Sequence, residues 1–395
     1  MDGSIGEDLH KLAQTRIPPN PRLFDLSREE DRMALSKLIA SGEIKHATDD
    51  YEEQQRELFG IRNPTKVYTP TFEEEFQTHY ASLSANVPLW QHGRWVYFPW
   101  RDLVAHILVE DEYWLVRTAR NQNLIRPEEQ KKFYDSTVGI AGLSVGSSVA
   151  FAIALSGGCK RMKLADMDRL ALTNTNRILA GVDRLGMLKV EMAARTIYEL
   201  NPYAELTLYS DGLLPENIGE FFEGLDIIID EIDNLAVKCL IREEAKRRGL
   251  AVVMAADNGD NAVVDVERYD LDPKTPFFHG RMGEVSYDLL KDLNKFEIGK
   301  LITKLVGAET VTERMQESLK EMGKTIVSWP QLGIAAMVNG ASVAYCVRKI
   351  LNGQPLEDDR ALISLDEKLI PDYNSPESQA HRKLVSAEFA KAFGL

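Results

Sequence analysis

The first residues that could carry chemistry form a glycine-containing turn at positions 142–147 (GLSVGS), between a run that favours a strand and a run that favours a helix. In such a turn, backbone N–H groups and the helix N-terminus can bind a phosphate. Asp166 follows 24 residues after Gly142, at the end of the next expected strand, where a carboxylate can accept hydrogen bonds from ribose hydroxyls. Gly142, Ser144, Gly146 and Asp166 therefore predict a nucleotide site without specifying the nucleotide.

These features alone leave three other interpretations open. An NAD-dependent oxidoreductase uses the same glycine turn and acidic residue. A serine hydrolase would place Ser144 at a nucleophile elbow and would need a later acid and histidine, for which only His279 and His381 are available. In the third interpretation the glycines serve only the geometry of a packed turn. More of the sequence is needed to choose among them.

Further polar motifs follow in order along the chain: Asp166-Met167-Asp168, a segment with Asn174 and Arg177, Leu185-Gly186-Met187-Leu188-Lys189, and Asp230-Glu231-Ile232-Asp233-Asn234. This series resembles the ThiF/MoeB/E1 superfamily of ATP-dependent adenylating enzymes, which activate ubiquitin-like proteins, sulfur carriers and certain ribosomal peptides. The resemblance covers residues 117–353. Residues 117–121, with Arg120, are similar to the family segment that reaches the ATP of the other subunit, so the resemblance implies a homodimer.

The resemblance implies a site for ATP and Mg²⁺. Attack of a carboxylate on the α-phosphate brings two anions together, so the site must supply positive charge and hold the reactants in line. Arg177, Lys189 and Arg120 would supply that charge, and Asp233 would bind Mg²⁺, which prefers oxygen ligands. Asn174 would orient the α-phosphate or the substrate carboxylate. The cofactor-binding residues implied are Gly142, Ser144, Gly146, Asp166, Asp168 and Asn234.

The chain departs from the family pattern in three places. Ser144 and Val145 replace two glycines of the family's Gly-x-Gly-Gly-x-Gly turn, so the turn would meet the nucleotide with a slightly different backbone. Residues 277–280 (FFHG) stand where sulfur-carrier activators place the first zinc Cys-x-x-Cys, and no later pair exists, so we expect no zinc. No cysteine lies between Cys239 and Cys346, where thioester-forming members carry their nucleophile. We therefore expect no enzyme thioester.

These observations predict an ATP-dependent adenylyltransferase that activates a carboxylate of a peptide or small protein as an acyl-adenylate and releases pyrophosphate. Peptide-modifying members of the family carry an N-terminal peptide clamp, and residues 1–110 match it in position and size. The alternatives are an NAD- or FAD-dependent oxidoreductase and a non-catalytic nucleotide-binding protein. Arg177, Lys189 and Asp233 favour ATP, because a hydride carrier needs no triphosphate clamp with a metal carboxylate.

The elements that must position these residues alternate between short apolar runs and longer helical ones. Helices are expected at 147–156, 188–200, 236–248 and 331–351, and strands at 137–141, 161–165, 205–209, 226–229, 251–255 and 262–269. This alternation predicts an α/β fold with a doubly wound, mainly parallel, Rossmann-like sheet in residues 111–395. Lys189 and Asp233 should then face a wet cleft at the sheet's carboxyl edge.

Residues 1–110 are expected to form a separate small α+β module. Ser27-Arg28-Glu29-Glu30 is a capping-box pattern, which predicts a helix ending near Gly42. A second helix is expected at 71–83. Residues 94–98 predict a strand that leads into a helix at 99–108.

Composition limits the partners of the 395-residue chain. Its 47 basic and 61 acidic residues give a net charge of −14, which disfavours binding to nucleic acid. Residues 138–158 and 326–347 are uncharged runs of membrane-spanning length, but glycines and serines in the first, and Pro330, Gln331 and Asn339 in the second, favour buried segments over membrane insertion. Three scattered cysteines fit a reducing, cytoplasmic setting.

Overall fold

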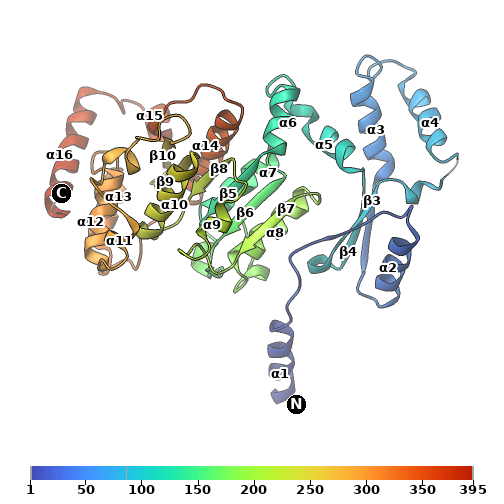
Figure 1. Ribbon diagram of the computed structural model, residues 1–395, viewed down its shortest axis with the longest axis horizontal. Helices are drawn as coiled ribbons and strands as arrows, with labels where there is room; N and C mark the ends of the chain where they lie inside the picture. The colour runs from blue at the N-terminus through green and yellow to red at the C-terminus, as the bar shows by residue number, and fades with distance from the viewer. Residues whose placement is uncertain (1, 86, 394–395) are drawn as a thin grey trace. The chain divides into compact units, whose positions relative to one another are not determined.

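The computed structural model describes residues 2–85 and 87–393, which form two compact units. The smaller unit contains Met1–Leu124 with Tyr198–Tyr203, and the larger contains Ile125–Ile197 with Ala204–Leu395 (Figure 1). The larger unit holds every predicted site residue except Arg120.

The larger unit is built on a seven-stranded sheet with the order β11-β10-β9-β8-β5-β6-β7. The five strands from β9 to β7 in this order pair in parallel, whereas β10 and β11 are antiparallel additions at one edge. The strands are β5 (Thr137–Ala141), β6 (Arg161–Ala165), β7 (Glu205–Tyr209), β8 (Ile227–Asp230), β9 (Ala251–Asn258), β10 (Asn261–Arg268) and β11 (Asp359–Ile363). The predicted doubly wound, mainly parallel α/β sheet is confirmed.

The order of the strands creates a switch point between β5 and β8. The chain runs from β5 to β6 and β7 in one direction, then returns to β8 and β9 on the other side of β5. Because such crossovers are right-handed, they place α7 (Gly146–Leu155) and α8 (Lys189–Leu200) on one face and α10 (Leu235–Arg248) on the other. Ligands of open α/β sheets bind at the carboxyl ends of the strands near this point.

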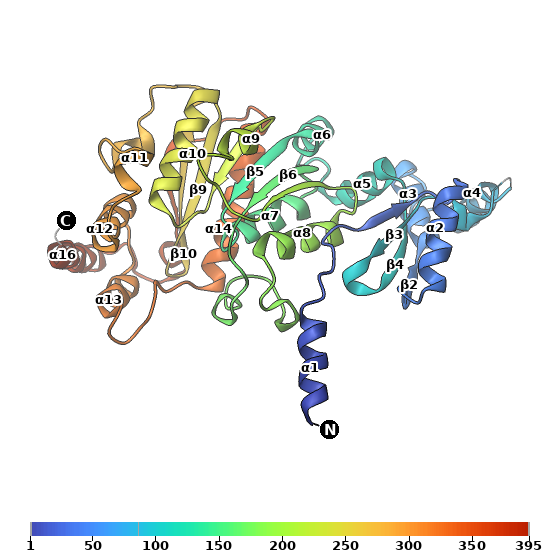
Figure 2. The same ribbon diagram turned by 60° about the horizontal axis from the view of Figure 1, so that its bottom comes forward.

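Helix α14 (Gly333–Leu351) packs on α7, β9 and β10 (Figure 2). A Cβ atom on Gly340 would lie 2.8 Å from the carbonyl oxygen of Ser148, so the two helices approach closely at this glycine. Within the described residues, α14 alone is long and apolar enough to cross a membrane, judged by length and composition, and half of it is buried inside the protein. Its packing accounts for its apolar composition.

The remaining elements of the larger unit surround this sheet. They are α6 (Pro127–Asp135), η4 (Leu172–Asn174), η5 (Val182–Arg184), α9 (Ile218–Phe222), η6 (Phe277–Gly280), α11 (Tyr287–Leu290), α12 (Lys295–Val306), α13 (Glu313–Glu321), α15 (Leu365–Leu369) and α16 (Pro376–Phe393). Apolar side chains from β5, β8, β9, α9 and α10 form one large buried cluster behind the site. This core fixes the strand ends that carry the predicted residues.

The smaller unit contains a four-stranded sheet with the order β1-β3-β4-β2. Its elements are α1 (Asp2–Ala13), β1 (Arg22–Phe24), α2 (Glu29–Ala40), β2 (His46–Asp49), α3 (Tyr51–Arg62), α4 (Phe72–Leu83), η1 (Leu89–Gln91), β3 (Arg94–Phe98), η2 (Pro99–Arg101), β4 (Leu103–Ile107), α5 (Glu110–Thr118) and η3 (Ala119–Asn121). The helices expected to end near Gly42 and to span 71–83 are present as α2 and α4. The strand at 94–98 is β3.

Two local predictions in this unit are wrong. Residues 99–108 form η2 and β4 instead of a helix, because Asp102 takes a left-handed conformation (φ +48°) and turns the chain back to pair antiparallel with β3. The expected capping box is also absent at Ser27. Its hydroxyl donates to Asp25 Oδ1 at 2.6 Å, and Arg28 is the N-cap of α2 without a side-chain capping bond.

Candidate functional site

The turn after β5 joins three strand ends. Gly142 has φ +86°, and a Cβ atom there would lie 2.3 Å from the carbonyl oxygen of Glu231, so only glycine fits. The N–H of Gly142 donates to the carbonyl oxygen of Ala165 at 2.8 Å. Gly146 opens α7 and lies close to the Ile140 side chain. The turn therefore holds the ends of β5, β6 and β8 together.

Ser144 and Val145, which replace two family glycines, have different roles in the turn. Neither residue has a positive φ, so the backbone requires no glycine at these positions. Val145 is buried as the N-cap residue of α7. The Oγ atom of Ser144 accepts a hydrogen bond from Nε of Arg177 at 3.2 Å. The serine thus brings a predicted phosphate-binding arginine to the turn.

Three charged residues, here called the β6 cluster, lie at the end of β6: Asp166, Asp168 and Lys189. The Oδ2 atom of Asp166 accepts from the N–H of Leu143 at 2.7 Å, and its Oδ1 atom accepts from the N–H of Asp168 at 2.8 Å. The Lys189 ammonium lies 2.8 Å from Asp168 Oδ2 and 3.8 Å from Asp166 Oδ2. Burial raises the pKa of Asp166, and Lys189 and the two N–H donors oppose that rise.

Lys189 and Asp233, which were both expected to face a wet cleft, differ in exposure, and the expectation is wrong for Lys189. Asp233 is exposed, but Lys189 is only 6% exposed. Lys189 begins α8, and its buried ammonium pairs with the exposed carboxylate of Asp168. Replacement of Lys189 should therefore affect folding as well as ligand binding.

Arg177 and Asn174 lie in the loop between β6 and α8. Arg177 donates from Nη1 to the carbonyl oxygen of Thr173 at 3.2 Å and to Oδ1 of Asn176 at 3.0 Å. Asn174 uses its Oδ1 to accept from the N–H of Ala171 at 3.0 Å. Nδ2 of Asn176 donates to the carbonyl oxygen of Gln331 at 2.7 Å. These bonds fix the loop against the segment before α14.

The motif at 230–234 divides into an inward and an outward half. Asp230 and Glu231 are buried, whereas Asp233 and Asn234 are exposed. The Oδ1 atom of Asn234 accepts from the N–H groups of Ala236 and Val237, at 3.0 and 3.2 Å, and so caps α10. The motif presents Asp233 to solvent on a loop that is anchored at both ends.

Asp257, near the end of β9, was not predicted. It is 7% exposed, and burial raises its pKa to about 6. Nε2 of Gln331 donates to its Oδ2 at 3.0 Å, and Nδ2 of Asn339 donates to its Oδ1. Arg177 lowers and Asp233 raises the pKa of Asp257. Because β8 and β9 pair in parallel, Asp257 lies at the same edge of the sheet as the loop that carries Asp233.

A signal for Asp257 is present in the sequence. It follows the expected strand 251–255 much as Asp166 follows the strand 161–165. Carboxyl ends of neighbouring parallel strands meet at one edge of a sheet, so this position merits the same interpretation. The family motifs draw attention to the ends of β6 and β8 only.

Arg120 is exposed in η3 of the smaller unit. The other predicted residues all belong to the larger unit. Its insertion into a partner subunit's site stays a prediction.

The exposed carboxylate of Asp233 is an oxygen ligand of the kind that Mg²⁺ prefers. Among the described residues, no three or more His, Cys, Asp or Glu side chains are grouped so that they could hold a metal ion. Mg²⁺ in nucleotide sites needs only one or two carboxylates in addition to phosphates. Asp233 and Asp257 supply carboxylates, and Oδ1 of the fully buried Asn339 has no hydrogen-bond partner. A closed all-protein metal site is not required.

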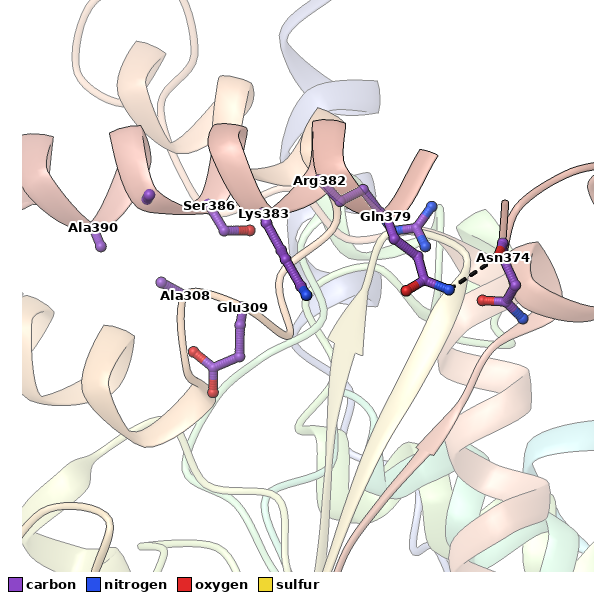
Figure 3. A pocket seen from close by; sticks show the side chains of 9 residues that line it. Ala308, Glu309, Asn374, Gln379, Arg382, Lys383, Ser386 and Ala390 are labelled. Atoms are coloured by element: carbon purple, nitrogen blue, oxygen red, sulfur yellow. Dashed lines mark hydrogen bonds between the residues drawn. The ribbon is translucent and has the colours of Figure 1, made fainter. Parts of the chain in front are cut away.

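A sizeable cavity of the larger unit lies elsewhere. It has a volume of about 650 Å³ and runs along α16, where Lys383 and Glu309 approach from facing segments (Figure 3). Gln379 donates to the carbonyl oxygen of Asn374 at its edge. None of the predicted site residues lines this cavity, so its size does not locate the chemistry.

The fold and the site together are those of a nucleotide-binding α/β protein. A glycine-containing turn follows β5, an acidic residue follows β6, and basic residues lie at the same edge of the sheet. The model of the ThiF family matches residues 117–361, and the chain belongs to this family. The resemblance to the ThiF/MoeB/E1 superfamily is confirmed.

Known proteins similar to the chain include an uncharacterized protein of Mycobacterium tuberculosis, MT1398, which is 39% identical over 276 residues, covering 70% of this chain and 38% of that protein. The tRNA threonylcarbamoyladenosine dehydratase of Escherichia coli is 28% identical over 155 residues, 38% of this chain and 58% of the dehydratase. The chain thus spans less than two thirds of either relative. A crystal structure of the E. coli dehydratase with ATP has a TM-score of 0.45 and 21% identity, covering 62% of this chain and 98% of the other.

Proposed function

We propose that this chain is an Mg²⁺- and ATP-dependent adenylyltransferase that activates a carboxylate of a peptide or small protein. The observation that carries the proposal is that Asp166 with Lys189, Arg177 at the turn after β5, and Asp233 after β8 all lie beyond the carboxyl ends of neighbouring parallel strands. Membership of the ThiF family supports the same reaction class. An oxidoreductase has no need of this arrangement.

The charged residues of the site would have different roles in the reaction. A substrate carboxylate oxygen bonds to the α-phosphorus of ATP, and the bond from that phosphorus to the bridging oxygen breaks, so pyrophosphate leaves with the electron pair. Arg177 and Lys189 would offset the charge that this step concentrates, because positioned cations act strongly in a partly desolvated site. Mg²⁺, held by Asp233, would neutralise phosphate charge. Asp166 would bind the ribose hydroxyls.

The environment of the cysteines supports transfer without an enzyme thioester. All three cysteines are buried. Burial raises the pKa of Cys239 to about 12 and that of Cys346 to about 11, and it also raises the pKa of Cys159. A thiol acts as a nucleophile in its thiolate form, which these environments disfavour. The acyl-adenylate is therefore proposed to pass to a nucleophile outside this chain.

The homodimer and the peptide substrate remain parts of the proposal. Arg120 lies in the segment that, in the resembled family, enters the partner's site. The smaller unit, with its own sheet and helices, is proposed to bind the peptide or small-protein substrate.

A nucleotide thermal-shift series tests the reaction class. ATP with Mg²⁺ should raise the melting temperature, by an amount equivalent to about 2.7 kcal/mol at a concentration 100 times Kd, because the ligand binds only the folded chain. NAD should not. Asp233→Ala should remove the Mg²⁺ dependence, whereas Asp288→Ala, which changes another exposed carboxylate, should not. Stabilisation by NAD and none by ATP would contradict the proposal.

A further inference from the structure

Asp257 is an unusual residue for a site that must attract anions. Its buried carboxyl is linked through Gln331 to Asn176, the neighbour of Arg177, yet among the described residues no ion pair within 4 Å joins Asp257 and Arg177. The Arg177 guanidinium is instead bonded to Ser144, Thr173 and Asn176. Asp257 is therefore not retained as the partner of this arginine, and its carboxyl needs another explanation.

The neighbours of Asp257 orient its carboxyl closely. Gln331 and Asn339 donate one amide N–H to each of its two oxygens, which fixes the plane of the group and leaves one lone pair on each oxygen. Gln331 is itself held, because its carbonyl oxygen accepts from Asn176 in the Arg177 loop. Such support from surrounding amides is typical of carboxylates that ligate metals.

A second observation points to a cation at this place. Asn339 is fully buried in α14, and its Oδ1 atom has no hydrogen-bond partner. The same Asn339 amide donates from Nδ2 to Asp257. Asp233 follows β8, which pairs in parallel with β9 in the register Ile229–Val253, so Asp233 and Asp257 come four residues after paired positions at one edge of the sheet. Two carboxyls and an unpaired amide oxygen create an excess of acceptors, which a divalent cation would balance.

We propose that Asp257 is a second carboxylate ligand, alongside Asp233, for the divalent cation that accompanies the nucleotide. This inference rests on the proposed function and extends it by one residue. Asp233 would approach the ion from the exposed loop after β8, and Asp257 from the end of β9. Two carboxylates from adjacent parallel strands, completed by phosphate oxygens, satisfy the oxygen preference of Mg²⁺.

The test measures metal binding without turnover. Mn²⁺ replaces Mg²⁺, and α,β-methylene-ATP replaces ATP, so that bound Mn²⁺ can be counted from the loss of the free-ion EPR signal. Asp257→Asn should weaken Mn²⁺ binding in the nucleotide complex about 10- to 100-fold. Asp260→Asn is the matched control, since it makes the same charge change three residues further along, at the β9–β10 turn, and should bind Mn²⁺ within about twofold of the wild type.

A second variant keeps the carboxyl itself. Gln331→Ala removes one supporting amide and should weaken Mn²⁺ binding about tenfold. It keeps the inference testable if Asp257→Asn does not fold, which melting curves would show. The inference alone would be overturned if Asp257→Asn bound Mn²⁺ as tightly as the wild type while Asp233→Asn had lost Mn²⁺ binding. If Asp257→Asn does not fold, the same outcome for Gln331→Ala would overturn it. A wild-type chain that binds neither nucleotide nor Mn²⁺ would overturn the proposed function and this inference with it.

Discussion

Two charged clusters lie beside the same sheet, and they differ in their access to solvent. The β6 cluster contains Asp166, Asp168 and Lys189. The second, here called the β8 cluster, contains Asp230, Arg242 and Glu267. Each contains two carboxylates and one strong cation, and in the β8 cluster the Lys238 ammonium also lies 3.2 Å from Asp230 Oδ1. Burial and hydrogen bonding distinguish the two clusters further.

The β8 cluster is fully enclosed. The guanidinium of Arg242 pairs with Asp230 and, at 2.7 Å, with Glu267, and it stacks 3.8 Å from the ring centroid of Phe278. Burial alone would raise the pKa of Asp230, but Lys238 and Arg242 outweigh it and hold that pKa below its usual value. Tyr269 and the N–H of Phe278 complete the bonding of Glu267. A ligand has no access to this cluster.

The β6 cluster is only partly enclosed. Asp168 has a side chain that is 65% exposed, and the pKa of Asp166 stays raised by burial although Lys189 opposes that effect. Its charges are thus incompletely compensated and open to solvent on one side. The comparison indicates that the β8 cluster fixes the loop that carries Asp233, whereas the β6 cluster keeps charge open to solvent, as the proposed ligand site requires.

The largest expected effect is on the stability of the β8 cluster. Arg242→Met should lower the free energy of unfolding by about 3 to 5 kcal/mol, because it leaves two buried carboxylates with one cation. Chemical denaturation monitored by circular dichroism measures this change. Arg247→Met alters an exposed arginine on the same helix and should change stability by less than about 0.5 kcal/mol. Equal effects of the two changes would remove the distinction between buried and exposed pairs.

Lys189→Ala should affect both rate and folding. Loss of one positioned charge should lower substrate-dependent ATP–pyrophosphate exchange about 100- to 1,000-fold. Because Lys189 is buried against Asp166, its loss should also destabilise the fold by about 1 to 3 kcal/mol. Lys291→Ala removes an exposed lysine paired with Asp288 and serves as the control for both measurements.

Subunit mixing separates the role of Lys189 from that of Arg120. In a mixture of Lys189→Ala and Arg120→Ala subunits, each mixed dimer should retain one complete site, so about a quarter of the sites should be active. An absence of recovery, from subunits shown to exchange, would place Arg120 outside the partner's site.

Much of the sheet and of the site could be predicted because the signals are local. The strands β5, β6 and β7 agree with the expected ranges residue for residue, since each is a short apolar run between turn residues. The glycine turn and the positions of Asp166 and Lys189 follow from the same alternation. These features require only the order of elements along the chain.

The remainder depends on contacts between distant segments. No feature of the sequence near Asp257 indicates its hydrogen bonds with Gln331 and Asn339, which lie 74 and 82 positions away. Both residues interrupt an apolar run, and such an interruption by itself indicates only burial. The prediction of a helix at 99–108 is wrong for another reason. A single residue in the left-handed conformation, Asp102, makes this segment a hairpin instead of a helix.

A smaller effect is expected for the pH dependence of stability at Asp257. Its pKa is about 6 in the folded chain, against an ordinary value of 3.8 for an aspartate, so folding favours the protonated form. This contribution is fully present below about pH 4 and is lost as the pH rises through about 6, a difference of about 3 kcal/mol at most. With a chelator present and no nucleotide, Asp257→Asn should therefore gain stability over the wild type between pH 4 and pH 7. A constant difference across this range would show that the carboxyl does not titrate there.

The smallest expected effect is that of the cysteines, which share the burial of the β8 cluster but have no ion-pair partners. Cys346 lies in α14, where burial raises the pKa of its thiol to about 11, so almost no thiolate forms near neutral pH. Cys346→Ala should leave ATP–pyrophosphate exchange within about twofold of the wild type and cost about 1 kcal/mol of stability through the lost packing. The same holds for Cys159→Ala and Cys239→Ala. A thiol-sensitive adduct between enzyme and substrate that disappears in one of these variants would identify that cysteine as a nucleophile and contradict transfer without a thioester.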